Sequence, residues 1–161
     1  MEFGITFKGF VSPDRARKLV KMAEEAGFDY CWFYDSHILR RESFVAMAMC
    51  MEHTTNMRFG PCVTNPNVRD WSVAASLYAS LALQSNGRFD IGLGRGDSSM
   101  RVMGKKPANL ARLTEFTHKV KAMVRGEEVM YGECEKPVKF PWATGYELPV
   151  WVGAYGPKAL A

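Results

Sequence analysis

Two aspartates and a histidine stand near the ends of apolar runs, in positions where side chains of these types can do chemistry. Asp35 closes the run YCWFYD, His37 follows it, and Asp97 comes shortly after the run DIGLG. A carboxylate and an imidazole that converge on one pocket can act as general acid and base. The structural alternative for each aspartate is a cap, since Asp is a common residue at the beginning of a helix.

The stretch DIGLGRGDSSM, residues 90–100, carries a glycine at every second position from 92 to 96. A dinucleotide-binding loop needs G-x-G-x-x-G between the first strand and its helix, and a P-loop needs Lys followed by Ser or Thr. Neither pattern occurs here. Adhesion through Arg-Gly-Asp requires secretion and an exposed loop, and the sequence indicates neither. We expect a buried strand whose glycine-rich end presents Asp97 to a pocket.

Strands and helices are expected to alternate along the chain. Apolar runs rich in β-branched and aromatic residues predict strands at 2–7, 30–35, 57–65, 88–94 and 148–154. Apolar residues at helical spacing, mostly closed by glycine, predict helices at 12–27, 42–54, 70–87 and 108–126. A further helix begins at 156. Residues 127–147 break the pattern and are expected to form a hairpin or loop insertion before the last strand.

Regular alternation of strands and helices predicts a parallel sheet built from right-handed crossovers. One architecture is a (βα)8 TIM barrel, which typically needs about 250 residues. The other is an open five-strand doubly wound sheet. Because the sequence stops just after a helix begins, we expect residues 1–161 to be a single partial domain containing the first five βα units of a truncated barrel.

Composition and charge narrow the class of partner. The net charge is +4, and segment 101–125 holds seven Lys or Arg and one acidic residue. This segment either forms a solvated helix face or attracts an anionic cofactor or substrate. No aromatic residues interleave with the cations, so we expect no nucleic acid partner.

The remaining composition predicts a cytoplasmic protein. No signal peptide and no apolar run of about 20 residues is present, so we expect no membrane partner. None of the four cysteines forms a C-x-x-C pair, and most sit in apolar runs. We therefore expect buried free thiols in a reducing compartment, with no disulfide framework and no metal site.

In either architecture ligands bind where parallel strands end. That rule points to the ends of the five expected strands, and the candidate site residues come from the last four. The candidates are Asp35, Ser36 and His37; Cys62, Val63, Thr64 and Asn65; Gly96 and Asp97; and Ala154 and Gly156.

Three segments resemble the luciferase-like superfamily, in its coenzyme F420-dependent oxidoreductase branch. They are AEEAGFDYCWFYDSH, FGPCVTNPNVRDWSVAASLYASLALQSNGRFDIGLGRGDS and LPVWVGAYGPKAL, and they follow the order and spacing of that family. The family fold is a (βα)8 barrel about twice as long as this chain. The resemblance therefore implies the N-terminal part of such a barrel.

The resemblance also implies roles for the candidate residues. A non-proline cis peptide is expected at Cys62–Val63, where it supports the ring of the cofactor, and Thr64 and Asn65 follow it. Asp35 matches an acid that contacts the deazaflavin ring, and Ser36 takes a position that relatives fill with histidine. Ala154 and Gly156 match backbone contacts to the phosphate side of the cofactor.

The expected catalytic residues are Asp97 and His37. Asp97, with Gly96 before it, matches a position usually held by glutamate near the reactive carbon of the ring. His37 is the other candidate for proton transfer.

The implied function is hydride transfer between the deazaflavin coenzyme F420 and a small-molecule organic substrate, in a protein expected to form a homodimer. The basic segment 101–125 is expected to help hold the phosphate and acidic tail of the coenzyme. The first alternative is an FMN-dependent luciferase-like monooxygenase. The second, of another class, is a non-catalytic barrel subunit or fragment that acts in assembly.

Overall fold

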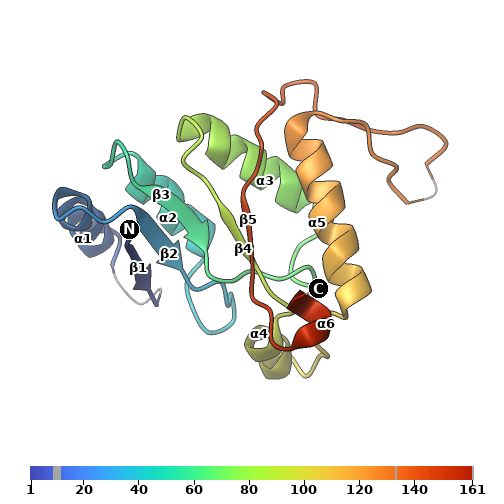
Figure 1. The fold of residues 1–161 in the computed structure, drawn as a ribbon, viewed down its shortest axis with the longest axis horizontal. Helices are drawn as coiled ribbons and strands as arrows, with labels where there is room; N and C mark the ends of the chain where they lie inside the picture. The colour runs from blue at the N-terminus through green and yellow to red at the C-terminus, as the bar shows by residue number, and fades with distance from the viewer. Residues whose placement is uncertain (9–11, 133, 161) are drawn as a thin grey trace.

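The computed structural model describes residues 1–8, 12–132 and 134–160. In these residues strands and helices alternate, except that two helices lie between the last two strands (Figure 1). The strands are β1 (Gly4–Phe7), β2 (Tyr30–Phe33), β3 (Arg58–Pro61), β4 (Ile91–Leu93) and β5 (Val150–Val152). The helices are α1 (Pro13–Glu25), α2 (Ser43–Met51), α3 (Trp71–Gln84), α4 (Asp97–Val102), α5 (Leu110–Arg125) and α6 (Pro157–Leu160).

The described strands are parallel and follow one another in chain order. β2 pairs with β1 and β3, and β4 pairs with β5. Two isolated parallel bridges, Phe59–Phe89 and Thr64–Leu93, connect the end of the first group to the second. A doubly wound sheet requires a reversal of strand order. No reversal occurs among these strands, so the chain forms the wall of a barrel-type fold and the doubly wound alternative is wrong.

Helix boundaries follow local chemistry. The side chains of Ser12, Asp70 and Asn109 accept backbone N–H bonds at the beginnings of α1, α3 and α5. Gly126, at φ +82°, ends α5 in the left-handed conformation that glycine adopts without strain. These caps explain why the predicted helices agree with the structure to within a few residues.

The sheet buries one face against the helices. Cys31 and Phe33 of β2 and Phe59 of β3 are fully buried in the hydrophobic core. Tyr30 and Trp32 alternate with them on the opposite face, where their rings stack 5.5 Å apart. Trp151 of β5 meets Trp32 edge-on at 5.8 Å and remains 50% exposed. The face away from the helices is therefore aromatic and partly open.

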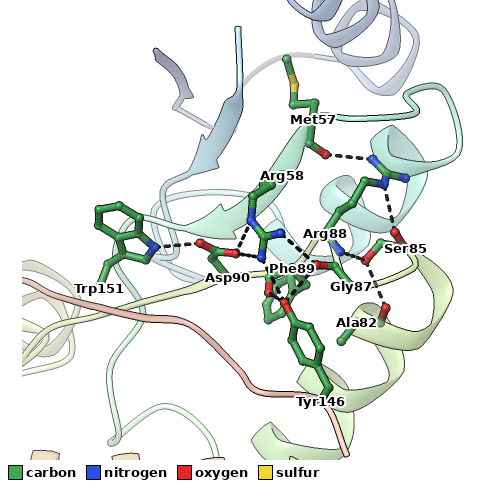
Figure 2. Close-up of polar contacts among 10 residues, drawn as sticks. All are labelled: Met57, Arg58, Ala82, Ser85, Gly87, Arg88, Phe89, Asp90, Tyr146 and Trp151. Carbon is green, nitrogen blue, oxygen red and sulfur yellow. Dashed lines mark hydrogen bonds and ion pairs between the residues drawn. The ribbon is translucent and has the colours of Figure 1, made fainter. Parts of the chain in front are cut away.

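A buried carboxylate joins the beginnings of β3, β4 and β5. Asp90 accepts hydrogen bonds from Arg58 on one oxygen and from the Trp151 indole on the other, at 2.8 Å (Figure 2). Arg58 also donates to the hydroxyl of Tyr146, which donates to the carbonyl of Phe89 at 2.6 Å. Because an unpaired buried charge is costly, this network fixes β5 beside β4 at the beginnings of the strands, away from their carboxyl ends.

Residues 127–147 connect α5 to β5. Val129 and Val138 form an antiparallel bridge, and Phe140 stacks on Trp142 at 4.9 Å. Tyr146 then enters the Asp90 network. In the described part of the chain, no helix combines the length and apolarity that a bilayer crossing requires.

The cysteine prediction is half wrong. Cys31 and Cys50 are buried free thiols, and burial raises the pKa of Cys50 to about 11. Cys62 and Cys134 are free but exposed. Cys62 follows the last paired residue of β3 and is exposed because it lines the open cleft.

Glu24 of α1 fixes the turn that leads into β3. Its carboxylate accepts hydrogen bonds from the backbone N–H groups of Thr55, Asn56 and Met57 at 2.7 to 3.1 Å. Burial alone would raise the pKa of Glu24, but these bonds outweigh it and lower the pKa below its ordinary value. A lowered folded-state pKa adds stability above the ordinary value, and that stability is lost as the pH falls.

We therefore expect Glu24→Gln to lower the free energy of unfolding by about 1 kcal/mol at neutral pH. The effect is modest because the side chain is partly exposed and water screens its interactions. The difference from wild type should shrink as the pH falls below 4.5. Urea titrations at several pH values measure this. The control is Glu25→Gln, an exposed neighbour outside the hydrogen-bonded turn. A difference that stays constant down to acidic pH would contradict the assignment.

Candidate active-site cleft

A cleft of about 1270 Å³ lies where the parallel strands end. Figure 1 shows α4 and α6 at this end of the molecule, beyond β4 and β5. The segments that follow β2, β3, β4 and β5 all contribute to its walls. The lining residues are Tyr34, Asp35, Ser36, Leu39, Arg40, Cys62, Val63, Gly94, Arg95, Gly96, Asp97, Ser98, Ser99, Arg101, Leu110, Leu113, Gly153, Tyr155, Gly156, Pro157, Lys158 and Ala159.

The cleft brings together most of the residues predicted from strand ends. Those that line it are Asp35, Ser36, Cys62, Val63, Gly96, Asp97 and Gly156. Thr64 and Asn65 are buried behind the wall, Ala154 lies next to lining residues, and His37 is exposed in a turn. Of the two expected catalytic residues, the structure therefore places only Asp97 on the cleft.

The wall formed by the end of β3 contains the expected cis peptide between Cys62 and Val63. Hydrogen bonds hold the chain on both sides of it. Cys62 N–H donates to the carbonyl of Phe33 at 2.7 Å, and Thr64 N–H donates to that of Gly92 at 2.8 Å. Gly94 N–H returns to the carbonyl of Thr64 at 2.9 Å. The wall is thus tied to β2 on one side and to β4 on the other.

The alternating glycines are explained by this close contact with β3. A Cβ at Gly92 would lie 2.3 Å from the carbonyl oxygen of Pro61, a distance that real Cβ atoms do not show. A Cβ at Gly94 would likewise lie 2.7 Å from the Val63 side chain. Gly96 has φ +85°, and its Cβ would lie 2.5 Å from Cγ of Asn65. The glycines accommodate the neighbouring strand end, and no phosphate loop is needed to account for them.

Asp35 is held from three sides and is 5% exposed. Thr64 donates its hydroxyl to Oδ2 at 2.6 Å, and Ser43 donates to Oδ1 at 3.2 Å. Arg69 donates to Oδ2 at 2.8 Å and, through its other nitrogen, to Glu42 at 2.9 Å. Both oxygens are therefore engaged with the ends of β3 and with the beginnings of α2 and α3.

Arg69 is the functional neighbour that the sequence does not reveal. Burial lowers the pKa of its guanidinium, but the negative charges of Asp35 and Glu42 raise that pKa by a larger amount. The net pKa lies above the ordinary value, so the guanidinium stays charged. The guanidinium also lies over the Phe44 ring, 4.6 Å from the centroid. Arg69 stands in a polar loop 34 residues from Asp35, and no periodicity connects the two.

Asp97 is the first residue of α4 and is exposed on the cleft. Among the described residues its carboxylate has no hydrogen bond or ion pair, unlike that of Asp35. Neighbouring Arg95 donates to the carbonyl of Ala108 at 2.6 Å, and Ser99 accepts from Asn65 at 3.0 Å. These bonds fix α4 and leave the Asp97 carboxylate available to a bound molecule.

The cleft carries cations as well as acids. Arg40 in the segment between β2 and α2, Arg101 of α4 and Lys158 of α6 all line it. Although Cys62 is exposed, partial desolvation raises the pKa of its thiol above the ordinary value. The arrangement can bind an anionic molecule, present a carboxylate for proton transfer and offer a backbone wall to a flat ring.

Helix α4 was not predicted from the sequence. Its residues Ser98, Ser99 and Arg101 form part of the cleft. The available signal was Asp97 followed by serines after a glycine, which is typical of a helix beginning. The segment DSSMRV is six residues long and mostly polar, so it shows no apolar residues at helical spacing. This explains why the helix was not predicted.

Comparisons with known proteins extend along the whole chain. The family model described as luciferase-like monooxygenase matches residues 1–161. The 5,10-methylenetetrahydromethanopterin reductase of Archaeoglobus fulgidus is 32% identical over 99% of this chain and 49% of its own length. That of Methanopyrus kandleri is 33% identical over 99% of this chain and 52% of its own length. The chain spans about half the length of the curated relatives it matches.

Solved structures agree with this assignment. Coenzyme F420-dependent tetrahydromethanopterin reductase from Methanopyrus kandleri has a TM-score of 0.86 and 27% identity, covering 99% of this chain and 52% of that one. The oxygenating constituent of 3,6-diketocamphane monooxygenase from Pseudomonas putida, in complex with FMN, has a TM-score of 0.73 and 16% identity, covering 94% and 51%. At the lower identity the likeness shows the fold alone.

Packing at Gly92 gives one prediction. We expect Gly92→Ala to lower the free energy of unfolding by about 1–3 kcal/mol, because the backbone of β3 must shift to admit the methyl group. Thermal or urea unfolding measures the change. Gly153→Ala is the matched control, since its Cβ would meet atoms no closer than 3.6 Å. Equal stability of the two variants would refute the close contact.

The hydrogen bonds and ion pair of Asp35 give a second prediction. We expect Asp35→Asn to destabilise the protein by about 2–3 kcal/mol, because it removes the charge that Arg69 faces in a buried site. Ser43→Ala, which removes only the 3.2 Å bond, should have an effect below about 1 kcal/mol. Chemical unfolding of both variants measures the contrast. An Asp35→Asn protein as stable as wild type would contradict the network.

Proposed function

The chain belongs to the luciferase-like monooxygenase family, and from this premise we propose that it binds coenzyme F420 and transfers hydride between that coenzyme and an organic substrate. The family resemblance inferred from sequence is confirmed. The coenzyme assignment is supported by relatives that are reductases and by the F420-dependent enzyme of similar structure. The chain covers about half the length of those proteins.

The observation that carries the proposal is the cleft itself. Its volume exceeds the roughly 300–1,000 Å³ of common ligand pockets, so a tricyclic ring and a substrate can lie in it together. Cys62 and Val63 line one wall of the cleft, and Gly94 and Gly153 add surface without side chains. The residues present fit a deazaflavin.

The coenzyme supplies the hydride chemistry, and the protein positions the reacting molecules. In this proposal Val63 and Cys62 support the ring, while Ser36 contacts it from the end of β2. Asp35, whose oxygens are already engaged, acts by holding this wall and contacts the ring only through its main chain. Thr64 and Asn65 hold the wall from behind. This refines the expected direct contact of Asp35.

Asp97 holds or accepts the proton that accompanies hydride transfer. It is exposed on the cleft with its carboxylate unengaged by described residues, so it can hydrogen-bond to a substrate. Gly96 gives the chain its turn before it. His37 lies in the turn after β2, outside the cleft lining, and its proposed role would require that turn to approach the substrate.

The phosphate side of the coenzyme is proposed to lie along Ala154 and Gly156, where β5 leads into α6. Lys158 and Arg101 also line the cleft and add positive charge. Opposite charges attract strongly in a partly enclosed cleft, which favours an anionic cofactor.

The relatives suggest the first substrate to test, 5,10-methylenetetrahydromethanopterin. We also propose that the protein is a cytoplasmic homodimer that acts on a small molecule and not on nucleic acid. The FMN-dependent monooxygenase is the second candidate, favoured by the shared fold of the FMN complex. A non-catalytic role in assembly is the third.

Titration of the full-length protein with oxidised and reduced F420, and with FMN, tests these alternatives. We expect F420 to bind more tightly than FMN. When methylenetetrahydromethanopterin is added to the complex with reduced F420, we expect the absorbance of oxidised F420 to appear as the coenzyme gives up its hydride. Tighter binding of FMN, together with oxygen consumption once the bound FMN has been chemically reduced, would support the monooxygenase. Binding of neither cofactor would leave the assembly role and overturn the proposal.

Asp97 is tested by substitution in the same protein. We expect Asp97→Asn to bind F420 within about twofold of wild type and to lose about 10²–10⁴ in turnover, the usual contribution of a general acid or base. Asp97→Glu, which keeps the carboxylate, should recover part of that loss. Turnover of Asp97→Asn equal to wild type would exclude the proton-transfer role.

A further inference from the structure

A second cavity, of about 430 Å³, opens beside the cleft between the segment that precedes α3 and the segment that follows α4. We call it the rim pocket. Its lining residues are Pro66, Asn67, Val68, Arg69, Asp70, Met100, Lys105, Lys106 and Arg112. None of the residues expected from strand ends lies in it.

Hydrogen bonds build the two walls of the rim pocket into one unit. The Asn67 amide donates to the carbonyl of Lys106 at 3.5 Å, which links the segments directly. Asn67 N–H donates to the Asn65 side chain at 3.0 Å, and Asn65 donates to Ser99 at 3.0 Å. Asn65 is 2% exposed, so this link is buried. The lysines therefore project from a fixed frame.

The rim pocket carries more positive charge than its own acids neutralise. Its lining contains four cationic side chains and a single carboxylate, that of Asp70. Asp70 caps α3, and one of its oxygens accepts from Ser72 N–H and hydroxyl at 2.8 and 2.6 Å. Arg69 is engaged with Asp35 and Glu42. Its charge is accounted for by those acids.

The uncompensated charge belongs to the other three cations. Arg112 has one distant acid, Glu115 at 3.6 Å, in an exposed pair that is worth little. Lys105 and Lys106 are exposed and make no ion pair with any described acid. Such a group of cations at a cavity attracts phosphate or carboxylate groups.

Helix α4 separates the rim pocket from the cleft by a single helix width. Ser99 and Arg101 line the cleft, whereas Met100 between them lines the rim pocket. A flexible anionic chain attached to a ring in the cleft can therefore pass over α4, past Arg101, and reach Lys105 and Lys106.

We propose that the rim pocket binds the acidic tail of coenzyme F420 while its ring lies in the cleft, an assignment that rests on the proposed function. Arg101, Lys105 and Lys106 attract the tail electrostatically, and Arg112 contributes the far wall. The pocket thereby gives specificity for the tailed coenzyme over its bare deazaflavin chromophore.

The test compares two ligands, the tailed coenzyme F420 and the tail-free deazaflavin chromophore. Dissociation constants are measured by fluorescence quenching at low and high salt with the full-length protein. The variant is Lys105→Gln with Lys106→Gln. The control, Lys136→Gln with Lys139→Gln, removes the same charge from segment 127–147, outside both cavities. Binding of the chromophore reports on correct folding of each variant.

We expect wild type and the control to prefer the tailed coenzyme, with a preference that weakens as salt rises. The Lys105/Lys106 variant should lose roughly tenfold of that preference, because two charges facing the tail are removed, and most of its salt dependence. Its affinity for the chromophore should not change.

Two outcomes count against the proposals separately. If wild type binds F420 and the Lys105/Lys106 variant keeps the preference and salt dependence of the control, the rim pocket is only a solvated basic surface and the inference is wrong. If wild type binds neither ligand, the proposed F420 function fails first. An equal loss in the control would indicate a general charge effect, which also overturns the specific site.

Discussion

The close approach of β4 to the end of β3 is the constraint on which the cleft depends. Only a residue without a side chain fits at position 92, where the Pro61 carbonyl fills the space of a Cβ. This approach allows the Thr64–Leu93 bridge that joins the two parts of the sheet. Farther along, Gly96 packs on Asn65 and sets where α4 begins. One backbone contact thus places the wall, the acid and the helix between the two cavities.

Two buried aspartates hold the sheet at its opposite ends. Asp90, paired with Arg58, connects the beginnings of β3, β4 and β5. Asp35, paired with Arg69, connects the ends of β2 and β3 to the helices that follow. In each case both oxygens of a buried carboxylate accept hydrogen bonds from neighbouring segments. The parallel strands have little length of their own, so these side-chain contacts supply much of the specificity of their arrangement.

The sequence predicted the order and type of most elements because the residues that begin and end them act through local contacts. Ser12 and Gly126 mark helix ends through contacts within a few residues. Strand lengths were overestimated, since the apolar run 57–65 continues after the chain leaves the ladder at Pro61. The candidate cleft was found from topology alone, but the engagement of Asp35 and the rim pocket were not. Both depend on residues such as Arg69 and Asn67 that meet distant partners only after folding.

The aromatic group on the face away from the helices has an optical consequence. Trp151 is half exposed, contacts Trp32 edge-on and donates its indole N–H to Asp90. Indole emission shifts with the polarity around the ring and with nearby charge. The intrinsic fluorescence of this chain therefore contains a signal from the inner face of the sheet. A polypeptide segment that covered this face would lower the polarity around Trp151 and move that emission toward the blue.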